Sequence, residues 1–384
     1  MRVLIAMGTR PEAIKLAPLV LAARDAPGVE PVVLGTGQHR EVFQDVLDLF
    51  GFTADLQADV MRPGQSLAAL SARCLEAFDP LIARARPDVV VVQGDTTSAA
   101  MGALAAFYHG VPVWHVEAGL RTSDPRLPFP EEMNRRIVTR LTSVHLAPTT
   151  EPRDNLVREG IDPADVVVTG NTGIDAFLLA VRMRDRFEDA RLAEIADGPW
   201  PLVVATTHRR ENWGAGIRRV AGALRDLLDR FPALRVVHAA HPNPAVRADV
   251  LAAYGGHDRA LIADPVGYGD FSRLLSRATV IVSDSGGIQE EAPSLGVPVL
   301  VARTETERHE GIRAGVARLV GTDGDLIVRE AARLLGDPDA RGRIAGIANP
   351  YGDGRAAARI CAMLLAAADG GDPRAAGRER EFTA

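Results

Sequence analysis

The sequence predicts an α/β protein with two doubly wound parallel sheets, one in each half of the chain. Short β-branched runs alternate with longer amphipathic segments from the N-terminus onward, as in folds built of β-α units. The run Val89–Val92 shows no polar alternation, which is typical of a strand buried on both faces. The alternation restarts after Val166–Val168, so the chain repeats this plan once.

The first half opens with an apolar run at Val3–Met7. We interpret this run as the first strand, because it is too short for a signal peptide and Gly8-Thr9-Arg10-Pro11 follows at once. Further strands are predicted at 31–34, 89–92, 113–116 and 143–146. Helices are predicted between them at 11–26, 38–50, 65–86 and 96–110.

The second half has strand candidates at 202–205, 235–238, 279–282 and 297–301, with helices between them and a further helix at 325–335. Turn residues at Thr169–Gly173 lie near mid-chain, so we place the hinge there. We expect an N-terminal domain over residues 1–170 and a C-terminal domain over 171–354. Two such domains imply a cleft, which is a usual place for a ligand. Residues 370–384 are small, polar and charged, and we expect a disordered tail.

Composition excludes several classes of protein. The 384 residues are 47% hydrophobic and 24% charged, as in ordinary globular proteins, and the net charge of −6 disfavours a surface that coats nucleic acid. The sequence contains no run of 18 apolar residues, so no membrane-spanning helix is predicted. Cys74 and Cys361 form no disulfide framework, which fits a reducing cytoplasm. We therefore expect a cytoplasmic protein that binds neither nucleic acid nor membrane.

Cofactor motifs are also missing from the sequence. No G-x-G-x-x-G follows the first strand, and no Walker A sequence or H-E-x-x-H occurs. The histidines show no recognisable metal-ligand spacing. The sequence therefore suggests no NAD, no ATP and no metal.

The segment Ser283–Glu291 is the most informative in the chain. It follows a predicted strand and opens a helix, where unpaired N–H groups can bind an anion. Gly286 and Gly287 let the backbone approach a ligand, and Ser285 adds a hydroxyl. Glu291, one turn later, can accept from two vicinal ribose hydroxyls. The segment indicates a nucleotide-diphosphate cradle, although a plain strand-turn-helix would use the same glycines.

Charged side chains follow other predicted strands. Arg10 follows the first strand, where its planar guanidinium suits phosphate, and Lys15 lies one turn on. Asp95 and Glu117 follow two further strands, at the edge where ligands bind in open α/β sheets. Neighbouring carboxylates raise one another's pKa, which suits proton abstraction. The alternatives are a helix N-cap at Asp95 and solvated surface charges at Arg10 and Lys15.

A third acid is Glu131, at the start of the next predicted helix, with Arg135 as the residue that orients it. Simple i,i+4 ion pairs of Glu131 with Arg135 and of Glu132 with Arg136 would explain the same pattern.

Two aromatic side chains in the second half are further candidates. His208 follows the first strand there beside two arginines, so it suits diphosphate oxygens, although a structural histidine would also fit. Phe271 can stack on a base, although a core phenylalanine is the simpler reading of its position.

Together these segments resemble the non-hydrolysing UDP-N-acetylglucosamine 2-epimerases. The matching stretches run in one order over nearly the whole chain: GTRPEAIKLAPLV, GQHREVF, GDTTS, HVEAGLRT, PFPEEMNRR, GNTGIDA, THRREN, DSGGIQEEAPSLGVPVLV and LVGTD. The resemblance implies two Rossmann-like domains in the GT-B-like fold of many glycosyltransferases, with a C-terminal helix at about 355–368 packing back on the first domain. It also implies a homodimer that interconverts UDP-GlcNAc and UDP-ManNAc without NAD or metal.

The resemblance also implies roles for individual residues. It gives the diphosphate contacts to Arg10, His208, Ser285, Gly286 and Gly287. It gives the ribose hydroxyls to Glu291 and the uracil to Phe271, near the Val266 backbone. It surrounds the sugar and the reacting bonds with Lys15, Asp95, Glu117, Glu131, Arg135 and Arg308.

The chemistry of the sugar limits the mechanism. The hydrogen at C2 is not acidic, so inversion needs either transient oxidation or elimination of UDP across C1–C2. We favour elimination, because no dinucleotide motif is present. A carboxylate would remove the C2 proton to give 2-acetamidoglucal, and UDP would add back while a proton arrives on the other face. Asp95, Glu117 and Glu131 are the candidates for these two roles, and the sequence does not assign the faces.

The sequence departs from the family pattern at several positions. Gln93 stands where a His is usual, and His309 where a Pro is usual. Glu41 and Gly64 lie in regions where some bacterial members bind a second UDP-GlcNAc as activator through polar or basic side chains, whereas His241 keeps one position of that region. We therefore expect activity on UDP-ManNAc without added UDP-GlcNAc.

Three alternative functions remain open at this point. A glycosyltransferase of the same fold would share the nucleotide cradle, and a hydrolysing epimerase would release ManNAc and UDP. A catalytically silent nucleotide-sugar sensor would bind without turnover. The pathway, whether for a cell-envelope polymer or a secondary metabolite, is likewise open.

Overall fold

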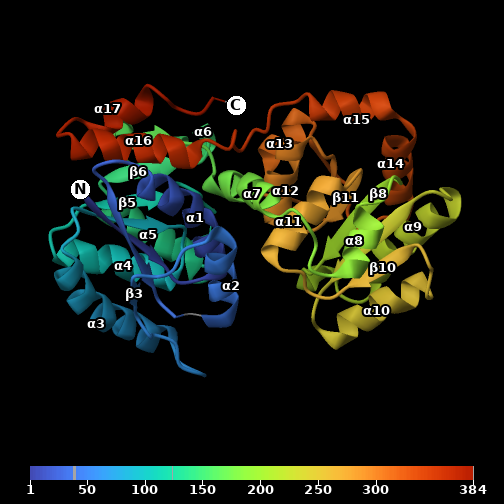
Figure 1. The fold of residues 1–384 in the computed structure, drawn as a ribbon, viewed down its shortest axis with the longest axis horizontal. Helices are drawn as coiled ribbons and strands as arrows, with labels where there is room; N and C mark the ends of the chain where they lie inside the picture. Colours follow the sequence, from blue (N-terminus) through green and yellow to red (C-terminus); the bar gives the residue numbers. More distant parts are fainter. Residues whose placement is uncertain (38–39, 123, 384) are drawn as a thin grey trace. The chain divides into compact units, whose positions relative to one another are not determined.

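The protein consists of two compact α/β units. The computed structural model describes residues 1–37, 40–122 and 124–383, the side chains of 40–42 excepted. The first unit comprises Met1–Leu179 and Tyr351–Ala384, and the second comprises Ala180–Pro350 (Figure 1). Each unit is built on one sheet in which all paired strands are parallel, as the sequence predicted.

The sheet of the first unit has the strand order β3-β2-β1-β4-β5-β6-β7. Its strands are β1 Arg2–Met7, β2 Glu30–Gly35, β3 Leu56–Gln57, β4 Val89–Gln93, β5 Val113–Val116, β6 Val144–Ala147 and β7 Val166–Val168. All residues of β4 are buried, which explains its unbroken apolar run. Because β1 pairs with both β2 and β4, the order reverses at β1.

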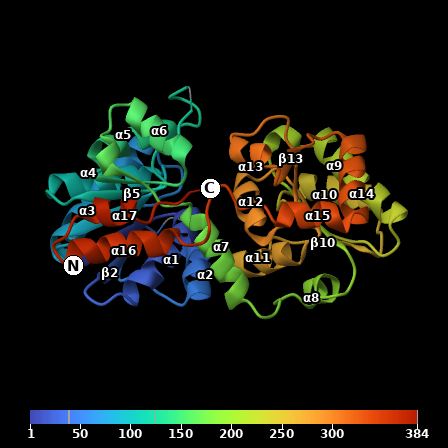
Figure 2. The same ribbon diagram turned by 90° about the horizontal axis from the view of Figure 1, so that it is seen from above.

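The helices of the first unit pack on this sheet or on one another, and one of them, at Thr172–Met183, continues into the second unit. They are α1 Arg10–Arg24, α2 Arg40–Phe50, α3 Leu67–Ala85, α4 Thr97–Tyr108, α5 Glu131–Leu141, α6 Thr150–Arg158, α7 Thr172–Met183, α16 Ala356–Ala368 and α17 Pro373–Arg378. One face packs on α3 and α4, where Cys74, Phe78 and Ala103 form a buried cluster with Leu4 and Val92. Figure 2 shows α16 alongside α1, although they come from opposite ends of the chain.

The second unit repeats this architecture with the strand order β10-β9-β8-β11-β12-β13. Its strands are β8 Leu202–Thr207, β9 Arg235–Ala240, β10 Ala260–Ala263, β11 Val280–Ser283, β12 Val299–Val301 and β13 Ala317–Leu319. Its helices are α8 Ala190–Ala196, α9 Ala215–Arg230, α10 Pro244–Tyr254, α11 Tyr268–Arg277, α12 Gly286–Glu291, α13 His309–Ala314, α14 Gly324–Gly336 and α15 Pro338–Ala345. The strands β8, β9 and β11 bury one face against α9, α10 and α14.

The division between the units differs from the predicted boundary at residue 170. The boundary between the two compact units falls between Leu179 and Ala180, inside α7. The predicted hinge at Thr169–Gly173 is packed within the first unit, where Asn171 is buried and its N–H donates to the carbonyl of Tyr351 at 2.9 Å. Likewise, Val166–Val168 does not open the second half but forms the last strand of the first sheet.

The prediction of a disordered tail over 370–384 is wrong for the residues that the structure describes there. The tail forms α17, and Phe382 is 5% exposed. The N–H of Phe382 donates to the carbonyl of Val168 at 2.8 Å, and the N–H of Val168 donates to the Glu381 carboxylate at 3.0 Å. The tail therefore covers the edge of β7. One buried aromatic residue, Phe382, anchors the tail, and the average polar composition of the segment does not reveal this anchor.

The start of the helix α16 is capped by Asp175 of α7, which lies far away in the sequence. The Asp175 carboxylate accepts from the backbone N–H groups of Ala356 at 3.2 Å and Ala357 at 2.9 Å. These donors belong to the first turn of α16, which has no helical partner for them. The cap therefore joins α7 to α16. Within the described ranges, no helix is both long and apolar enough to cross a membrane.

Candidate active site

The loops after β1, β4 and β5 carry the predicted acids and cations of the first unit. These three strands are neighbours in a parallel sheet, so their carboxyl ends meet at one edge. Arg10 begins α1 directly after β1, and its half-buried side chain forms no hydrogen bond or ion pair with the described residues. Asp95 follows β4, and Glu117 follows β5. The edge thus presents two carboxylates and a guanidinium from adjacent strands.

Glu12, which the sequence analysis gave no role, joins two of these loops. It completes the capping box of α1 with Thr9 and also accepts from the Thr96 hydroxyl at 2.6 Å. Its side chain is 2% exposed, and burial raises its pKa, although hydrogen bonds from Thr96 and from Gly8 and Thr9 partly oppose this. Glu12 therefore fixes the loop after β1 against the loop after β4. Its capping-box spacing was the sequence signal for it.

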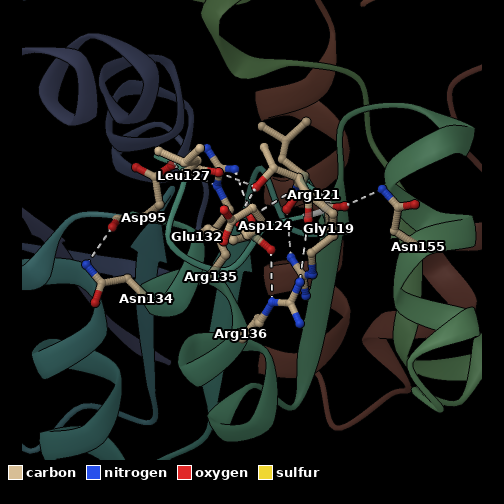
Figure 3. A network of polar contacts seen from close by, with 12 residues as sticks. Asp95, Gly119, Arg121, Asp124, Leu127, Glu132, Asn134, Arg135, Arg136 and Asn155 are labelled. Carbon is tan, nitrogen blue, oxygen red and sulfur yellow. Dashed lines mark hydrogen bonds and ion pairs between the residues drawn. The ribbon is translucent and has the colours of Figure 1, made fainter. Parts of the chain in front are cut away.

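Asp95 forms an ion pair and does not cap a helix. Thr96 caps α4, accepting from the N–H of Ala99 at 3.0 Å, so the N-cap alternative for Asp95 is wrong. The Asp95 Oδ2 instead accepts from Arg135 through Nε at 2.9 Å and lies 2.7 Å from its second terminal nitrogen. Asn134 donates to the Asp95 carbonyl at 2.9 Å (Figure 3). Two residues of α5 therefore hold the acid after β4.

The start of α5 differs from the predicted pairing. Arg135 contacts Asp95 and Glu132, so the predicted pair with Glu131 is not formed. Glu132 is fully buried and also pairs with Arg136 at 2.9 Å, as the i,i+4 spacing predicted (Figure 3). Glu131 is half-buried and forms no hydrogen bond or ion pair within 1–37, 40–122 and 124–383. Its carboxylate is thus the one acid of the three that no described side chain holds.

Glu117 is held by residues from two other elements. Lys15 Nζ donates to its two carboxylate oxygens at 2.5 and 2.7 Å, and Gln93 Nε2 donates to Oε2. Its backbone φ is 63°, a value that residues other than glycine rarely adopt. The sequence placed Glu117 at the strand end but gave no signal for this conformation. Lys15 therefore serves Glu117, a partner that its position one turn after Arg10 did not predict.

In the second unit, His208 is fixed by a buried carboxylate. Asp284 is fully buried and accepts from the backbone N–H of His208 at 3.1 Å, the N–H of Arg209 at 3.0 Å and the Asn212 amide at 2.9 Å. Its Oδ1 also lies 3.0 Å from His208 Nδ1. Burial would raise the pKa of Asp284, but these hydrogen bonds and His208 outweigh it and hold the pKa below its usual range. His208 is therefore oriented with Nε2 away from Asp284.

The predicted cradle begins at the N-cap of α12. Ser285 occupies that N-cap, yet its side chain caps no helical N–H, so its hydroxyl is not consumed by the helix. A Cβ on Gly286 would lie 3.2 Å from the guanidinium carbon of Arg308, so the glycine allows this side chain to lie close to the start of α12. Gly287 is exposed. Arg308 itself donates to Glu290 at 2.8 Å and to Glu307 at 2.5 Å.

The remaining predicted binding residues lie around α11. Val266 precedes this helix, and Phe271 lies in its first turn, half-buried and so not a core residue. The Tyr268 hydroxyl donates to the Glu291 carboxylate at 3.4 Å. This contact links α11 to the end of α12 and places a second aromatic residue beside Glu291, which the sequence analysis did not single out. His309 is the first residue of α13, a position that a Pro would also suit.

The groups available in each unit define its chemistry. The first unit offers carboxylates held by cations, which suits proton transfer. The second unit offers His208, an uncommitted serine hydroxyl and helix-start N–H groups, which suit an anion. Among the described residues, no cluster of three or more His, Cys, Asp or Glu side chains could hold a metal ion. The Glu41 side chain, one of the positions considered for an activator, lies outside the described part.

Comparison with known proteins assigns the chain to a family. The family model for UDP-N-acetylglucosamine 2-epimerase matches residues 21–365. The chain belongs to the UDP-N-acetylglucosamine 2-epimerase family. It is 45% identical over 370 residues to the UDP-N-acetylglucosamine 2-epimerase of Escherichia coli K12, covering 95% of this chain and 98% of the relative.

Solved structures of similar proteins share the fold. A protein from Listeria monocytogenes superposes with a TM-score of 0.93 at 40% identity, covering 100% of this chain and 99% of its own. The UDP-GlcNAc 2-epimerase of Neisseria meningitidis, solved with UDP-GlcNAc bound, gives a TM-score of 0.82 at 38% identity, covering 95% and 100%. The two parallel sheets thus belong to a GT-B-like fold, as the sequence resemblance implied.

Proposed function

We propose that this chain is an isomerase that interconverts UDP-GlcNAc and UDP-ManNAc by eliminating UDP across C1–C2 and adding it back. The observation that carries the proposal is the pair of acids at adjacent strand ends, Asp95 and Glu117, each held by a cation of its own unit. A fixed cation beside a carboxylate orients it, so the carboxylate can take a proton in a defined direction.

The forward half-reaction breaks two bonds and forms one double bond. A carboxylate takes the proton from C2, the C2–H electron pair becomes the C1=C2 bond, and the C1–O electron pair leaves with UDP. The product is 2-acetamidoglucal. In the reverse half-reaction, a carboxylic acid donates its proton to the other face of C2 while a UDP oxygen attacks C1. Asp95, Glu117 and Glu131 are our candidates for base and acid.

The departing UDP gains negative charge, so donors at the diphosphate lower the barrier. We assign this role to Arg10, to His208 with Ser285, and to the backbone of Gly286 and Gly287. The side chains support the assignment because Arg10 has no partner among the described residues and Ser285 caps no helix.

The nucleotide and the sugar take the remaining residues. We assign the ribose hydroxyls to Glu291 and the uracil to Phe271, with the Val266 backbone nearby. The half-buried Phe271 and the Tyr268–Glu291 contact support this assignment. Lys15, Arg135 and Arg308 are assigned to the sugar end, where the first two already hold acids. The proposed reaction needs no NAD and no metal. We also propose that the protein is a homodimer, and its molar mass from sedimentation equilibrium would test this.

Solvent deuterium distinguishes this function from its rivals. Incubation with UDP-GlcNAc alone in deuterated water should give UDP-ManNAc and deuterium at C2 of both nucleotide sugars. A glycosyltransferase would leave C2 unlabelled without an acceptor. Accumulation of free ManNAc and UDP would instead support the hydrolysing epimerase, and binding of UDP-GlcNAc without any labelling would support a sensor.

A further inference from the structure

The conformation of Glu117 depends on its neighbours. Its φ of 63° lies in the left-handed region, which is strained for a residue other than glycine and persists only where the surroundings enforce it. Arg86 is the one other non-glycine residue with a positive φ among the described residues. The Glu117 side chain is 7% exposed. Groups that fix this carboxylate therefore decide where it points.

Gln93 is one of these groups. It ends β4, is 3% exposed, and donates from Nε2 to Glu117 Oε2. Lys15 approaches the same carboxylate from α1. The two donors come from different elements, so they fix the carboxylate in two directions.

The backbone next to Gln93, at Gly94, is itself held in place by hydrogen bonds. The N–H of Gly94 donates to the carbonyl of Val116 at 3.0 Å, and His115 Nε2 lies 2.7 Å from the carbonyl of Gly94. Burial lowers the pKa of His115 to about 4, so its ring is neutral near pH 7 and donates this bond from Nε2. The Gln93 amide is thus presented from a segment that β5 fixes on both sides.

The neutrality of the amide matters for a proton-abstracting group. A neutral donor fixes the direction of a carboxylate through a hydrogen bond and places no second positive charge beside it. Lys15 already supplies one cation. A glutamine at this place therefore adds orientation without adding a full charge.

We propose that Gln93 is a positioning residue for the epimerisation, which directs the Glu117 carboxylate toward the hydrogen at C2. This inference rests on the proposed function. Gln93 acts through Glu117, so its loss should slow proton exchange at C2 and leave nucleotide binding unchanged.

The test replaces Gln93 by a side chain of similar length without a donor. The Gln93→Met variant should lose about 10- to 100-fold in kcat for deuterium incorporation at C2, because small misplacements of a reacting group cost that much. Its KM for UDP-GlcNAc and its Kd for UDP should stay within about two-fold of wild type. The variant loses only the hydrogen bond to Glu117 and no group that we assign to the nucleotide. Gln93→His should recover most of the rate, because an imidazole N–H can donate.

A matched control is Val92→Ala, one residue earlier in the same strand. Val92 is fully buried and packs near Phe78 and Gly102, so the variant loses core packing and stability but should keep the kcat of the folded protein. Should Gln93→Met fail to fold, Gln93→Leu takes its place. A wild-type kcat in the donor-free variant, or equal losses in Gln93→Met and Gln93→His, would overturn the inference. Absence of C2 exchange in the wild type would instead refute the proposed function.

Discussion

At the scale of single residues, the site depends on buried carboxylates that hold other side chains. Asp284 accepts from two backbone N–H groups and one amide while lying 3.0 Å from His208 Nδ1. Glu12 joins two loops, and Glu132 holds Arg135 and Arg136. Asp284 and Glu132 contact the candidate residues His208 and Arg135 directly, whereas Glu12 fixes the two loops that carry Arg10 and Asp95. These acids are the structural support on which His208, Arg10 and Asp95 depend.

Replacing Asp284 by Asn should destabilise the second unit. The NH2 group of the Asn side chain would face N–H groups that now donate hydrogen bonds to the carboxylate. The free energy of unfolding should therefore fall by about 3 kcal/mol. Because the pKa of Asp284 is lowered in the folded protein, its contribution is complete above the unfolded value of 3.8 and is lost as the pH falls below it. Urea unfolding of both proteins should therefore differ most near pH 7 and converge in acid. An equal difference at both pH values would contradict this account.

The sequence predicted which residues stand at strand ends but not their partners. Arg10, Asp95, Glu117 and His208 each follow a strand, because hydrophobic runs and their ends are visible in the sequence. The pairing of Arg135 with Asp95 instead of Glu131 depends on how α5 lies beside the loop after β4, which spacing within α5 cannot reveal.

At the scale of elements, α16 depends on a cap from a distant segment. Asp175 accepts from the N–H groups of Ala356 and Ala357 and is 7% exposed. Burial raises its pKa to about 6, from a usual 3.8, and the hydrogen bonds oppose this only in part. The folded protein therefore binds this proton more tightly than the unfolded chain does.

The Asp175→Asn variant tests this cap. Ionisation of Asp175 should cost no stability below pH 3.8, an increasing amount through the window up to about 6, and its full amount above that. An Asn keeps an acceptor for α16 and cannot ionise. The unfolding free energy of the variant minus that of the wild type should thus rise with pH across this window. Parallel pH curves for the two proteins would show that the buried charge is not responsible.

Elements with a clear apolar pattern were predictable from the sequence, and very short elements without one were not. The predicted helix at 325–335 appears as Gly324–Gly336, and the strand at 113–116 matches β5. The strands β3 and β13 have two and three residues, too few for a periodic pattern to emerge. Similarly, α17 is short and polar, and the burial of Phe382 that anchors the tail cannot be seen in its composition.

At the scale of the whole molecule, the chain builds the same kind of parallel sheet twice and closes the first unit with its own C-terminus. The doubled plan and the family were visible in the sequence, because ordered motifs span both halves. The division inside α7 was not, since a continuous helix gives no turn signal where packing changes partner.

The central claim is that the C1–O bond of the nucleotide sugar breaks and re-forms during each turnover. Transient oxidation would also exchange the C2 hydrogen, so deuterium alone cannot decide between the mechanisms. UDP-GlcNAc carrying ¹⁸O in the bridge between C1 and the β-phosphorus decides it. Recovered substrate should show the label moved into non-bridging positions of the β-phosphate, because released UDP can rotate before it adds back. Label that stays entirely in the bridge, while C2 exchanges with solvent, would contradict the elimination mechanism.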